Sequence, residues 1–193
     1  MSAPQPTADD LQQVLDRLAQ VLNEHRTNYA LIGGLGAAVR GTVRTTWDID
    51  LLVATSQMEL PRLLESLQQE EFDLEVYRAI RSWNEDNLLE FRYGQVRVDW
   101  IKALLPLFQR ILERAKWEDI GGRPIRVADA EGLLVLKLIA MRPQDQQDIQ
   151  GILTANRGLL DLDWVRCQWW AVVDEDDPAK LQFEQFVREF YVA

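Results

Sequence analysis

The sequence predicts an α+β fold, in which a mixed β-sheet flanked by helices is followed by a helical C-terminal part. Three observations predict it. Short apolar runs that end at glycines alternate with amphipathic segments in the first half of the chain. A stretch in which apolar and polar residues alternate comes next, and beyond it apolar residues recur at helical spacing. We expect a core over residues 1–125 and a helical part over residues 126–193, packed together as one unit.

The first elements follow from apolar spacing and from glycine stops. Leucine and valine recur every three or four residues from Leu11 to Leu22, which predicts a helix over residues 7–26. The runs "YALIGG" and "DIDLLV" are typical of short buried strands, and "LGAAVRG" between them is typical of a short helix. A helix over residues 58–69 follows.

Between Phe72 and Ile101 the apolar period changes to two, which indicates strands. Within this stretch "LLEFRYGQVRVDWI" predicts a hairpin that turns at Gly94 and Gln95. On its second arm the valines and tryptophan face one side, so Arg97 and Asp99 face the other.

The remaining segments are mostly helical. We expect helices in "ALLPLFQRILERA", in "DAEGLLVLKLIAM" with Asp129 as its N-cap, in a stretch from Pro143 to Gly158, and over residues 178–189. The segment "GGRPIRV" predicts a short edge strand.

Composition narrows the function. The chain has 193 residues and no apolar run as long as the roughly 20 residues of a membrane span, so we expect a cytoplasmic protein without a membrane partner. A net charge of -10 argues against a generic nucleic-acid binder. One cysteine and one histidine cannot build a Cys/His metal cluster. Any metal would be held by carboxylates, which favours Mg²⁺ or Mn²⁺.

Two aspartates open the second buried strand. Asp48 and Asp50 are at alternate positions, so their carboxylates leave the same face of the sheet, where a cation would relieve their repulsion. A solvated strand end has the same pattern. Gly33 and Gly34 stand between a strand and a helix, a place where a backbone can approach a phosphate, although a plain turn also uses glycine there.

Two later residues extend this pattern. Asp99 supplies a third carboxylate from another strand, or is simply an exposed residue of that strand. Lys137 stands in an apolar helix, where its ammonium needs a partner or water. It points into a cleft or lies at the edge of the helix with its charge in solvent.

Taken together, the glycine pair, D-x-D and the later aspartate resemble the signature of the nucleotidyltransferase superfamily, with its polymerase-β-like fold. The resemblance is sharpest to the abortive-infection nucleotidyltransferases, which are the toxins of type IV toxin–antitoxin pairs. It rests on "GGLGAAVRGTVRTTWDIDLLV" and on "LLVLKLIAMRPQDQQDIQGIL", which is similar to that group's K-x-x-A and D-x-x-D motifs. Gly34 replaces the serine that the superfamily often has after the first glycine.

The resemblance implies a role for each matching residue. Asp48, Asp50 and Asp99 would bind the metal ions and form the catalytic set with Lys137. The nucleotide would be held by Gly33, Gly34, Arg44, Thr45, Lys137 and Arg142, with Asp145 and Asp148 supporting the site. Arg44 is equally well explained as a loop residue, and Arg142 as a charge that complements a helix dipole.

The function implied is Mg²⁺-dependent transfer of an NMP from an NTP to an acceptor hydroxyl. The acceptor is a tRNA 3′ end, a protein or a small molecule, and the toxin version adds a cognate antitoxin protein as a partner. The alternative is a catalytically weak or inactive nucleotide-binding module with a regulatory role on the same fold.

Overall fold

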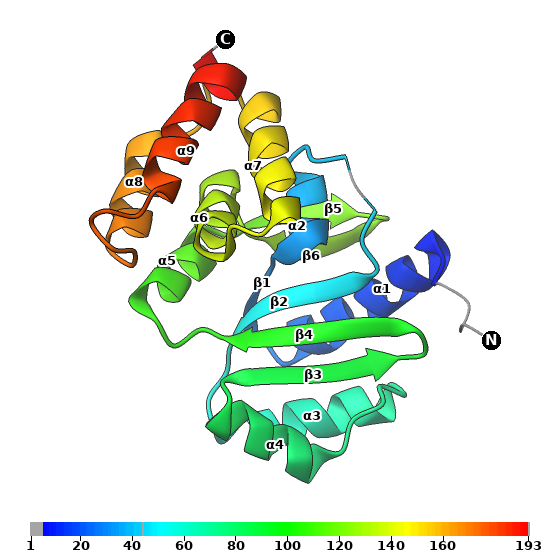
Figure 1. The fold of residues 1–193 in the computed structure, drawn as a ribbon. Coiled ribbons are helices and arrows are strands. Elements are labelled where there is room, and N and C mark those ends of the chain that lie inside the picture. Colours follow the sequence, from blue (N-terminus) through cyan, green and yellow to red (C-terminus); the bar gives the residue numbers. More distant parts are fainter. Residues whose placement is uncertain (1–5, 44, 193) are drawn as a thin grey trace, which may run out of the picture.

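A computed structural model describes residues 6–43 and 45–192 of the chain. These residues form a six-stranded mixed sheet with the order β3-β4-β2-β1-β6-β5 (Figure 1). Neighbouring strands are antiparallel in the pairs β3/β4, β1/β2 and β5/β6, and parallel in the pairs β2/β4 and β1/β6. The strands are β1 (Asn28–Leu31), β2 (Asp48–Ala54), β3 (Leu88–Tyr93), β4 (Val96–Lys102), β5 (Lys116–Ile120) and β6 (Arg123–Val127).

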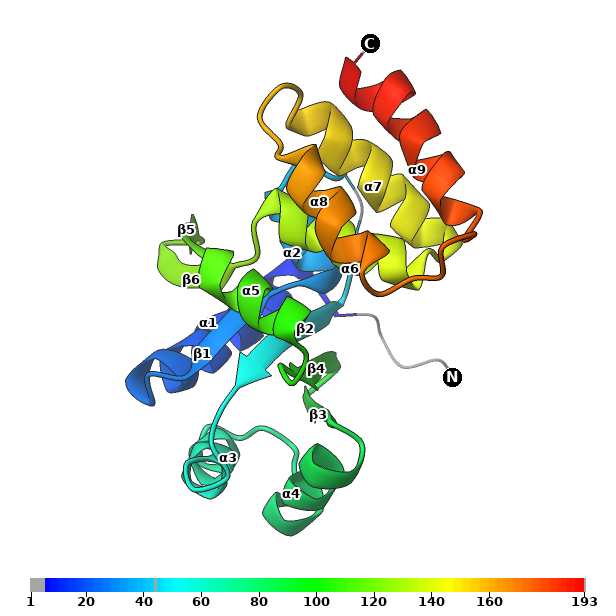
Figure 2. The ribbon, with the colours of Figure 1, turned by 90° about the vertical axis from the view of Figure 1, so that its left-hand side faces the viewer.

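Helices cover both faces of this sheet (Figures 1 and 2). One face carries α1 (Ala8–Glu24), α3 (Leu60–Gln69) and α4 (Val76–Glu85). The other face carries the remaining helices: α2 (Gly33–Val39), α5 (Pro106–Arg114), α6 (Ala130–Ala140), α7 (Pro143–Ala155), α8 (Leu162–Trp170) and α9 (Ala179–Phe186), which continues as a π-helical segment η1 (Val187–Val192). The expected α+β fold, with a mixed sheet flanked by helices, is confirmed.

The core consists of two hydrophobic clusters, one on each face of the sheet, and successive side chains of β2 point into them alternately. Ile49 and Leu51 pack into the cluster with α1, α3 and α4. Leu52 packs into the cluster with the later helices. Asp48 and Asp50 have the same parity as Leu52, so their side chains leave the sheet on the side of α6 and α7.

Several sequence predictions are confirmed, including the helix at the N-terminus, the strands β1 and β2, and the hairpin that turns at Gly94 and Gln95. Three were wrong or incomplete. The stretch after Phe72 contains a helix, α4, because its apolar residues Ala79 and Trp83 recur at helical spacing. The strand in "GGRPIRV" is β6, which is interior because the unpredicted β5 forms the edge beside it. Helix α8 was also not predicted.

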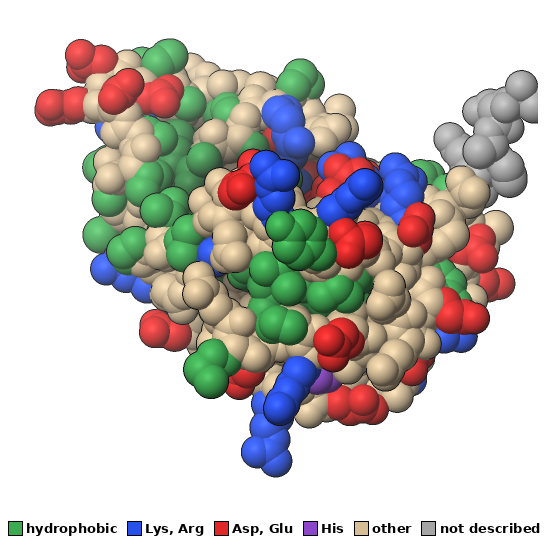
Figure 3. Space-filling model, turned by 90° about the horizontal axis from the view of Figure 1, so that it is seen from below, with side chains coloured by type: hydrophobic (Ala, Val, Ile, Leu, Met, Phe, Trp, Pro, Cys, Tyr) green, Lys and Arg blue, Asp and Glu red, His purple; other side chains and the backbone are tan. Residues whose placement is uncertain are grey.

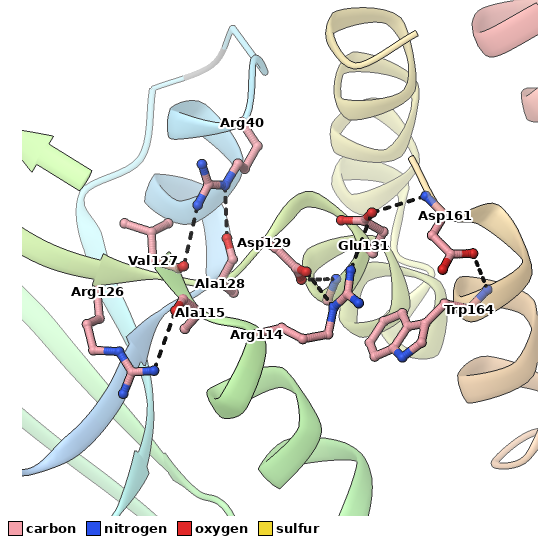
Figure 4. Close-up of polar contacts among 11 residues, drawn as sticks. Arg40, Arg114, Ala115, Arg126, Val127, Ala128, Asp129, Glu131, Asp161 and Trp164 are labelled. Carbon is pink, nitrogen blue, oxygen red and sulfur yellow. Dashed lines mark hydrogen bonds and ion pairs between the residues drawn. The ribbon is translucent and has the colours of Figure 1, made fainter. Parts of the chain in front are cut away.

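A polar network joins the sheet to the helical part at the start of α6 (Figure 4). Asp129 caps α6 through a bond from the Gly132 N–H at 2.9 Å, as the sequence predicted. Arg114, at the end of α5, donates to Asp129 and lies 3.4 Å from Glu131. Its guanidinium also stacks over the ring of Trp164 in α8, 4.4 Å from the centroid. These contacts fix α6, the helix that carries Lys137, relative to the sheet.

None of the helices in the described ranges has the length and apolar character needed to cross a membrane.

Candidate active site

The register of the central strands brings the three predicted aspartates together. In the parallel pair β2/β4, Asp50 lies directly opposite Asp99, and Asp48 lies opposite Arg97. Residues paired in this way project from the same face of a sheet. The three carboxylates therefore share one face of two adjacent strands, although Asp99 is far from Asp48 and Asp50 in the sequence.

The glycine turn lies against Asp50 because β1 and β2 are antiparallel, so the end of β1 meets the start of β2. The Ile32 N–H donates to the Asp50 backbone carbonyl at 2.9 Å. Gly33 has a φ of +64°, and a Cβ added to it would stand 1.8 Å from Asp50 Oδ2. Glycine is thus required at position 33 for two independent reasons, its backbone conformation and its closeness to a carboxylate.

The environment of Asp50 disfavours its ionised form. Burial raises its pKa above the ordinary value, and the charges of Asp99 and Asp48 raise it further. The charge of Lys137 and a hydrogen bond from the Gly34 backbone oppose this rise without cancelling it. The cluster carries more negative charge than its surroundings balance, as is expected where a cation belongs.

Asp99 is held by the arginine two residues before it. Arg97 Nε donates to Asp99 Oδ1 at 2.9 Å, and Arg97 Nη2 lies 3.0 Å from Glu90 Oε2 on β3. Burial still raises the pKa of Asp99, although the bond to Arg97 works against the rise. Arg97 therefore bridges two carboxylates across the β3/β4 hairpin.

Lys137 is buried and paired, which the sequence left open. Its Nζ donates to Asp145 Oδ1 at 3.0 Å and lies 2.7 Å from Asp148 Oδ2. The Lys137 side chain is 5% exposed and those of the two aspartates 0% and 1%. Three such charges in the interior are sustained only as a hydrogen-bonded group. The D-x-x-D spacing on α7 serves to hold this lysine.

A sharp corner between α6 and α7 makes the contact. Met141 has a φ of +46° and ends α6, and Pro143 begins α7 two residues later. Asp145 then accepts bonds from Arg142, from its backbone N–H at 3.1 Å and its Nε at 2.6 Å. Burial would raise the pKa of Asp145, but the hydrogen bonds from Arg142 and Lys137 lower it below the ordinary value.

Most of these groups line one cavity of about 470 Å³ between the sheet and the corner of α6 and α7. Besides the charged groups, its lining includes the apolar residues Ile101, Phe108, Leu136, Ile139 and Ala140. A volume of this size is in the range of small-molecule and nucleotide sites. A slightly larger, more open hollow of about 520 Å³ near Trp117 contains none of the predicted site residues.

The cavity gathers most of the residues that the sequence predicted, and it adds others. Its lining includes Gly33, Gly34, Asp48, Asp50, Asp99, Lys137, Arg142 and Asp145. Thr46 lines it among the described residues, while its neighbour Thr45 is exposed, and Arg44 lies outside the described residues. Asp148 supports the site through Lys137.

Sequence reasoning missed Glu90. Counting outward from the turn at Gly94 and Gln95 places it opposite Asp99, which the β3/β4 register confirms. The hairpin alone could therefore have identified it.

A divalent cation suits the donor set in kind, because Asp48, Asp50 and Asp99 offer the oxygen ligands that Mg²⁺ and Mn²⁺ prefer. As the side chains are oriented, no three His, Cys, Asp or Glu groups in the described part of the chain stand close enough to hold an ion. Asp99 is turned toward Arg97 instead.

Comparison with known families finds one match over nearly the whole chain. The model of a family described as "Nucleotidyltransferase of unknown function (DUF6036)" matches residues 9–190. The search of curated proteins found no match.

Solved structures with a similar fold include three with informative descriptions. An antigenic nucleotidyltransferase-like protein from Paracoccidioides brasiliensis has a TM-score of 0.55 at 15% identity, over 94% of this chain and 95% of that one. The antibiotic-resistance factor ANT(2'')-Ia has a TM-score of 0.58 at 17% identity, over 93% and 98%. The lincosamide antibiotic adenylyltransferase LnuA, bound to lincomycin, has a TM-score of 0.55 at 16% identity, over 79% and 99%. At these identities the similarity establishes a shared fold.

Proposed function

This chain belongs to the nucleotidyltransferase family DUF6036, and from that premise we propose that it transfers an NMP from an NTP to a hydroxyl of a small molecule, with Mg²⁺ or Mn²⁺. The observation that carries the proposal is the cavity in which Asp50 and Asp99 stand in register beside the Gly33 turn. Three carboxylates, a close backbone turn and cationic groups beside them are the parts that nucleotidyl transfer needs.

Charge and shape favour a small acceptor over RNA. A polynucleotide is held mainly by Lys and Arg contacts to its phosphates. This chain has a net charge of -10, and in the view from below its acidic and basic side chains are intermixed (Figure 3). The apolar residues of the cavity lining, Phe108 among them, offer a surface for the nucleobase or for a ring of the acceptor. The similar folds of ANT(2'')-Ia and LnuA, both described by their action against antibiotics, support the same choice.

The reaction would be an in-line displacement. The acceptor hydroxyl attacks the α-phosphorus of the NTP, the bond to the β-phosphate oxygen breaks, and pyrophosphate leaves. Bound Mg²⁺ would supply withdrawal of negative charge from the phosphates and a lower pKa for the acceptor hydroxyl. Asp48, Asp50 and Asp99 would hold it.

The remaining roles fall to the protein's own side chains. Asp99 would accept the proton of the acceptor hydroxyl. The backbone at Gly33 and Gly34 would cradle the triphosphate. Phosphates can come close to this backbone because position 33 carries no Cβ.

Lys137 and Arg142 would complete the phosphate site. An ammonium has three N–H donors, and Asp145 and Asp148 engage two of those of Lys137. The third is left for a phosphate oxygen in the cavity that Lys137 lines. Arg142 is anchored to Asp145 but is itself largely exposed, so it can close over the nucleotide from the rim.

The test is transfer of label from each α-labelled NTP in the presence of Mg²⁺. The wild type and Asp50→Asn are incubated separately with a panel of hydroxyl-bearing small molecules, with total RNA and with cell protein. Asp176→Asn, which removes an exposed carboxylate outside the cavity, is the matched control. We expect label in the small-molecule fraction for the wild type and Asp176→Asn, and loss of more than about 100-fold for Asp50→Asn.

Other outcomes point elsewhere. Label in RNA or protein would mean that the acceptor is a tRNA 3′ end or a protein hydroxyl instead of a small molecule. It would also favour the hypothesis that the protein is a toxin with a cognate antitoxin as its partner. Nucleotide binding by calorimetry without transfer would favour the regulatory module. If neither transfer nor nucleotide binding occurs, the proposed function is wrong.

A further inference from the structure

The charged face of the sheet extends one strand beyond the aspartates. On β3, Glu90 stands directly opposite Asp99 and Arg92 directly opposite Arg97. Like charges opposite each other on neighbouring strands repel. Repulsion from Arg92 therefore favours an Arg97 side chain that points toward the carboxylates. Arg97 contacts Asp99 at 2.9 Å and Glu90 at 3.0 Å.

The two contacts of Arg97 are made by different nitrogens. Nε donates to Asp99 Oδ1, and Nη2 lies against Glu90 Oε2. One guanidinium is shared by two carboxylates, so weakening the contact of Arg97 with one of them strengthens its contact with the other. The side chains of Arg97 and Glu90 are 37% and 48% exposed, and that of Asp99 is 17% exposed, so the bridge lies at the rim of the cavity.

A cation and Arg97 compete for the same carboxylate. A divalent ion bound to Asp99 needs the lone pairs of that carboxylate, and a guanidinium bonded to Oδ1 both occupies one oxygen and neutralises its charge. Removing Arg97 would leave Asp99 repelled by Asp50, which a cation relieves. Glu90 acts on this competition indirectly, because it draws the guanidinium away from Asp99.

We propose that Glu90 is a positioning residue for the metal site, which it controls by holding Arg97 as a tethered competitor for Asp99. This inference rests on the proposed function, since it concerns the metal that the proposed reaction uses. When a divalent cation takes Asp99, Arg97 keeps its contact with Glu90 and stays at the cavity rim. Glu90 thus affects how tightly the three aspartates bind a divalent cation.

The proposal predicts opposite effects for the two partners. Arg97→Gln frees Asp99, so Mn²⁺ should bind about fivefold more tightly, in line with a half-exposed ion pair. Glu90→Gln leaves Arg97 with Asp99 as its one strong partner, so Mn²⁺ should bind more weakly by a similar factor. Without Arg97 the Glu90→Gln change has no guanidinium to release, so the double variant should bind Mn²⁺ as Arg97→Gln alone does.

The experiment measures Mn²⁺ binding to the nucleotide-free full-length protein by electron paramagnetic resonance and calorimetry, with no activity required. The variants are Glu90→Gln, Arg97→Gln, the double variant and Asp50→Asn. The matched control is Glu85→Gln, which removes the same charge from an exposed pair on α4, where Glu85 lies 2.9 Å from Arg81. Thermal unfolding checks that each variant is folded before its Mn²⁺ binding is compared.

Three results decide the matter. Opposite shifts for Glu90→Gln and Arg97→Gln, with no effect of Glu90→Gln in the Arg97→Gln background and none for Glu85→Gln, support the proposal. An equal weakening by Glu90→Gln in both backgrounds would mean that Glu90 acts only through its charge, and would overturn it. If the wild type and Asp50→Asn bind Mn²⁺ equally weakly, the metal site of the proposed function fails, and this inference fails with it.

Discussion

Replacing Gly33 by alanine tests the closest contact in the site. The added Cβ would stand 1.8 Å from Asp50 Oδ2, 2.5 Å from its Cγ and 2.7 Å from its Cβ. All three atoms belong to one carboxylate side chain that is rooted in the central strand β2. Either Asp50 moves out of register with Asp99 or the turn after β1 moves away from the sheet.

The cost of this substitution has two parts. An alanine held at a φ of +64° costs about 1 to 2 kcal/mol relative to glycine. Crowding of a packed site adds about 1 to 3 kcal/mol. The free energy of unfolding should therefore fall by about 2 to 5 kcal/mol, and metal binding should weaken because Asp50 is displaced.

Gly94 provides a control for the first part alone. It has a φ of +55°, and a Cβ there would meet nothing within 4 Å. In urea titrations Gly94→Ala should lose about 1 to 2 kcal/mol, from backbone strain only. Adding Asp50→Ala removes two of the three crowded atoms, so Gly33→Ala should cost less in that background than in the wild type.

The reasoning would be refuted if Gly33→Ala and Gly94→Ala destabilised the protein equally. It would also be refuted if Asp50→Ala left the cost of Gly33→Ala unchanged. Either result would mean that the turn and the carboxylate do not share the space that the structure assigns to them.

Three further outcomes are expected. Lys137→Met removes the buried ammonium that Asp145 and Asp148 share, so the free energy of unfolding should fall by about 3 to 5 kcal/mol in urea titrations; a loss below about 1 kcal/mol would contradict the buried charge group. Burial raises the pKa of Asp145, but bonds from Arg142 and Lys137 outweigh it and hold that pKa below the ordinary value of an aspartate. Its contribution to stability should be fully present above about pH 4 and lost as the pH falls through the folded-state pKa, a loss that Asp145→Asn should remove from the pH profile of unfolding. Saturating Mg²⁺ should raise the melting temperature of the wild type by about 5 °C or more, and a similar rise in Asp50→Asn would place the ion elsewhere.

Local pattern was enough for the parts of the site that lie within one element. The alternation in "DIDLLV" puts Asp48 and Asp50 on one face, whatever packs against them. The hairpin turn at Gly94 sets the parity of Asp99 and, by counting, the partner of Asp99 on β3. Each depends on a period or a turn that a few residues specify.

The local sequence pattern did not predict features that depend on neighbouring elements of the fold. Whether β6 is an edge or an interior strand depends on whether β5 pairs with it, and five residues in "KWEDI" give a weak signal by themselves. Helix α4 was not predicted because the alternating residues that follow it led to a strand interpretation of the whole stretch. Short apolar runs do not distinguish a helix from a strand.

The sequence by itself determined which residue types were available for chemistry: paired aspartates, a glycine turn, one later aspartate and a lysine in an apolar helix. Only the tertiary structure decided what each of them faces. The parallel register of β2 and β4 put Asp99 beside Asp50, and the corner between α6 and α7 turned Lys137 into a buried partner of two aspartates. Strand register and helix packing are set by contacts between residues far apart in the chain, and no local period encodes them.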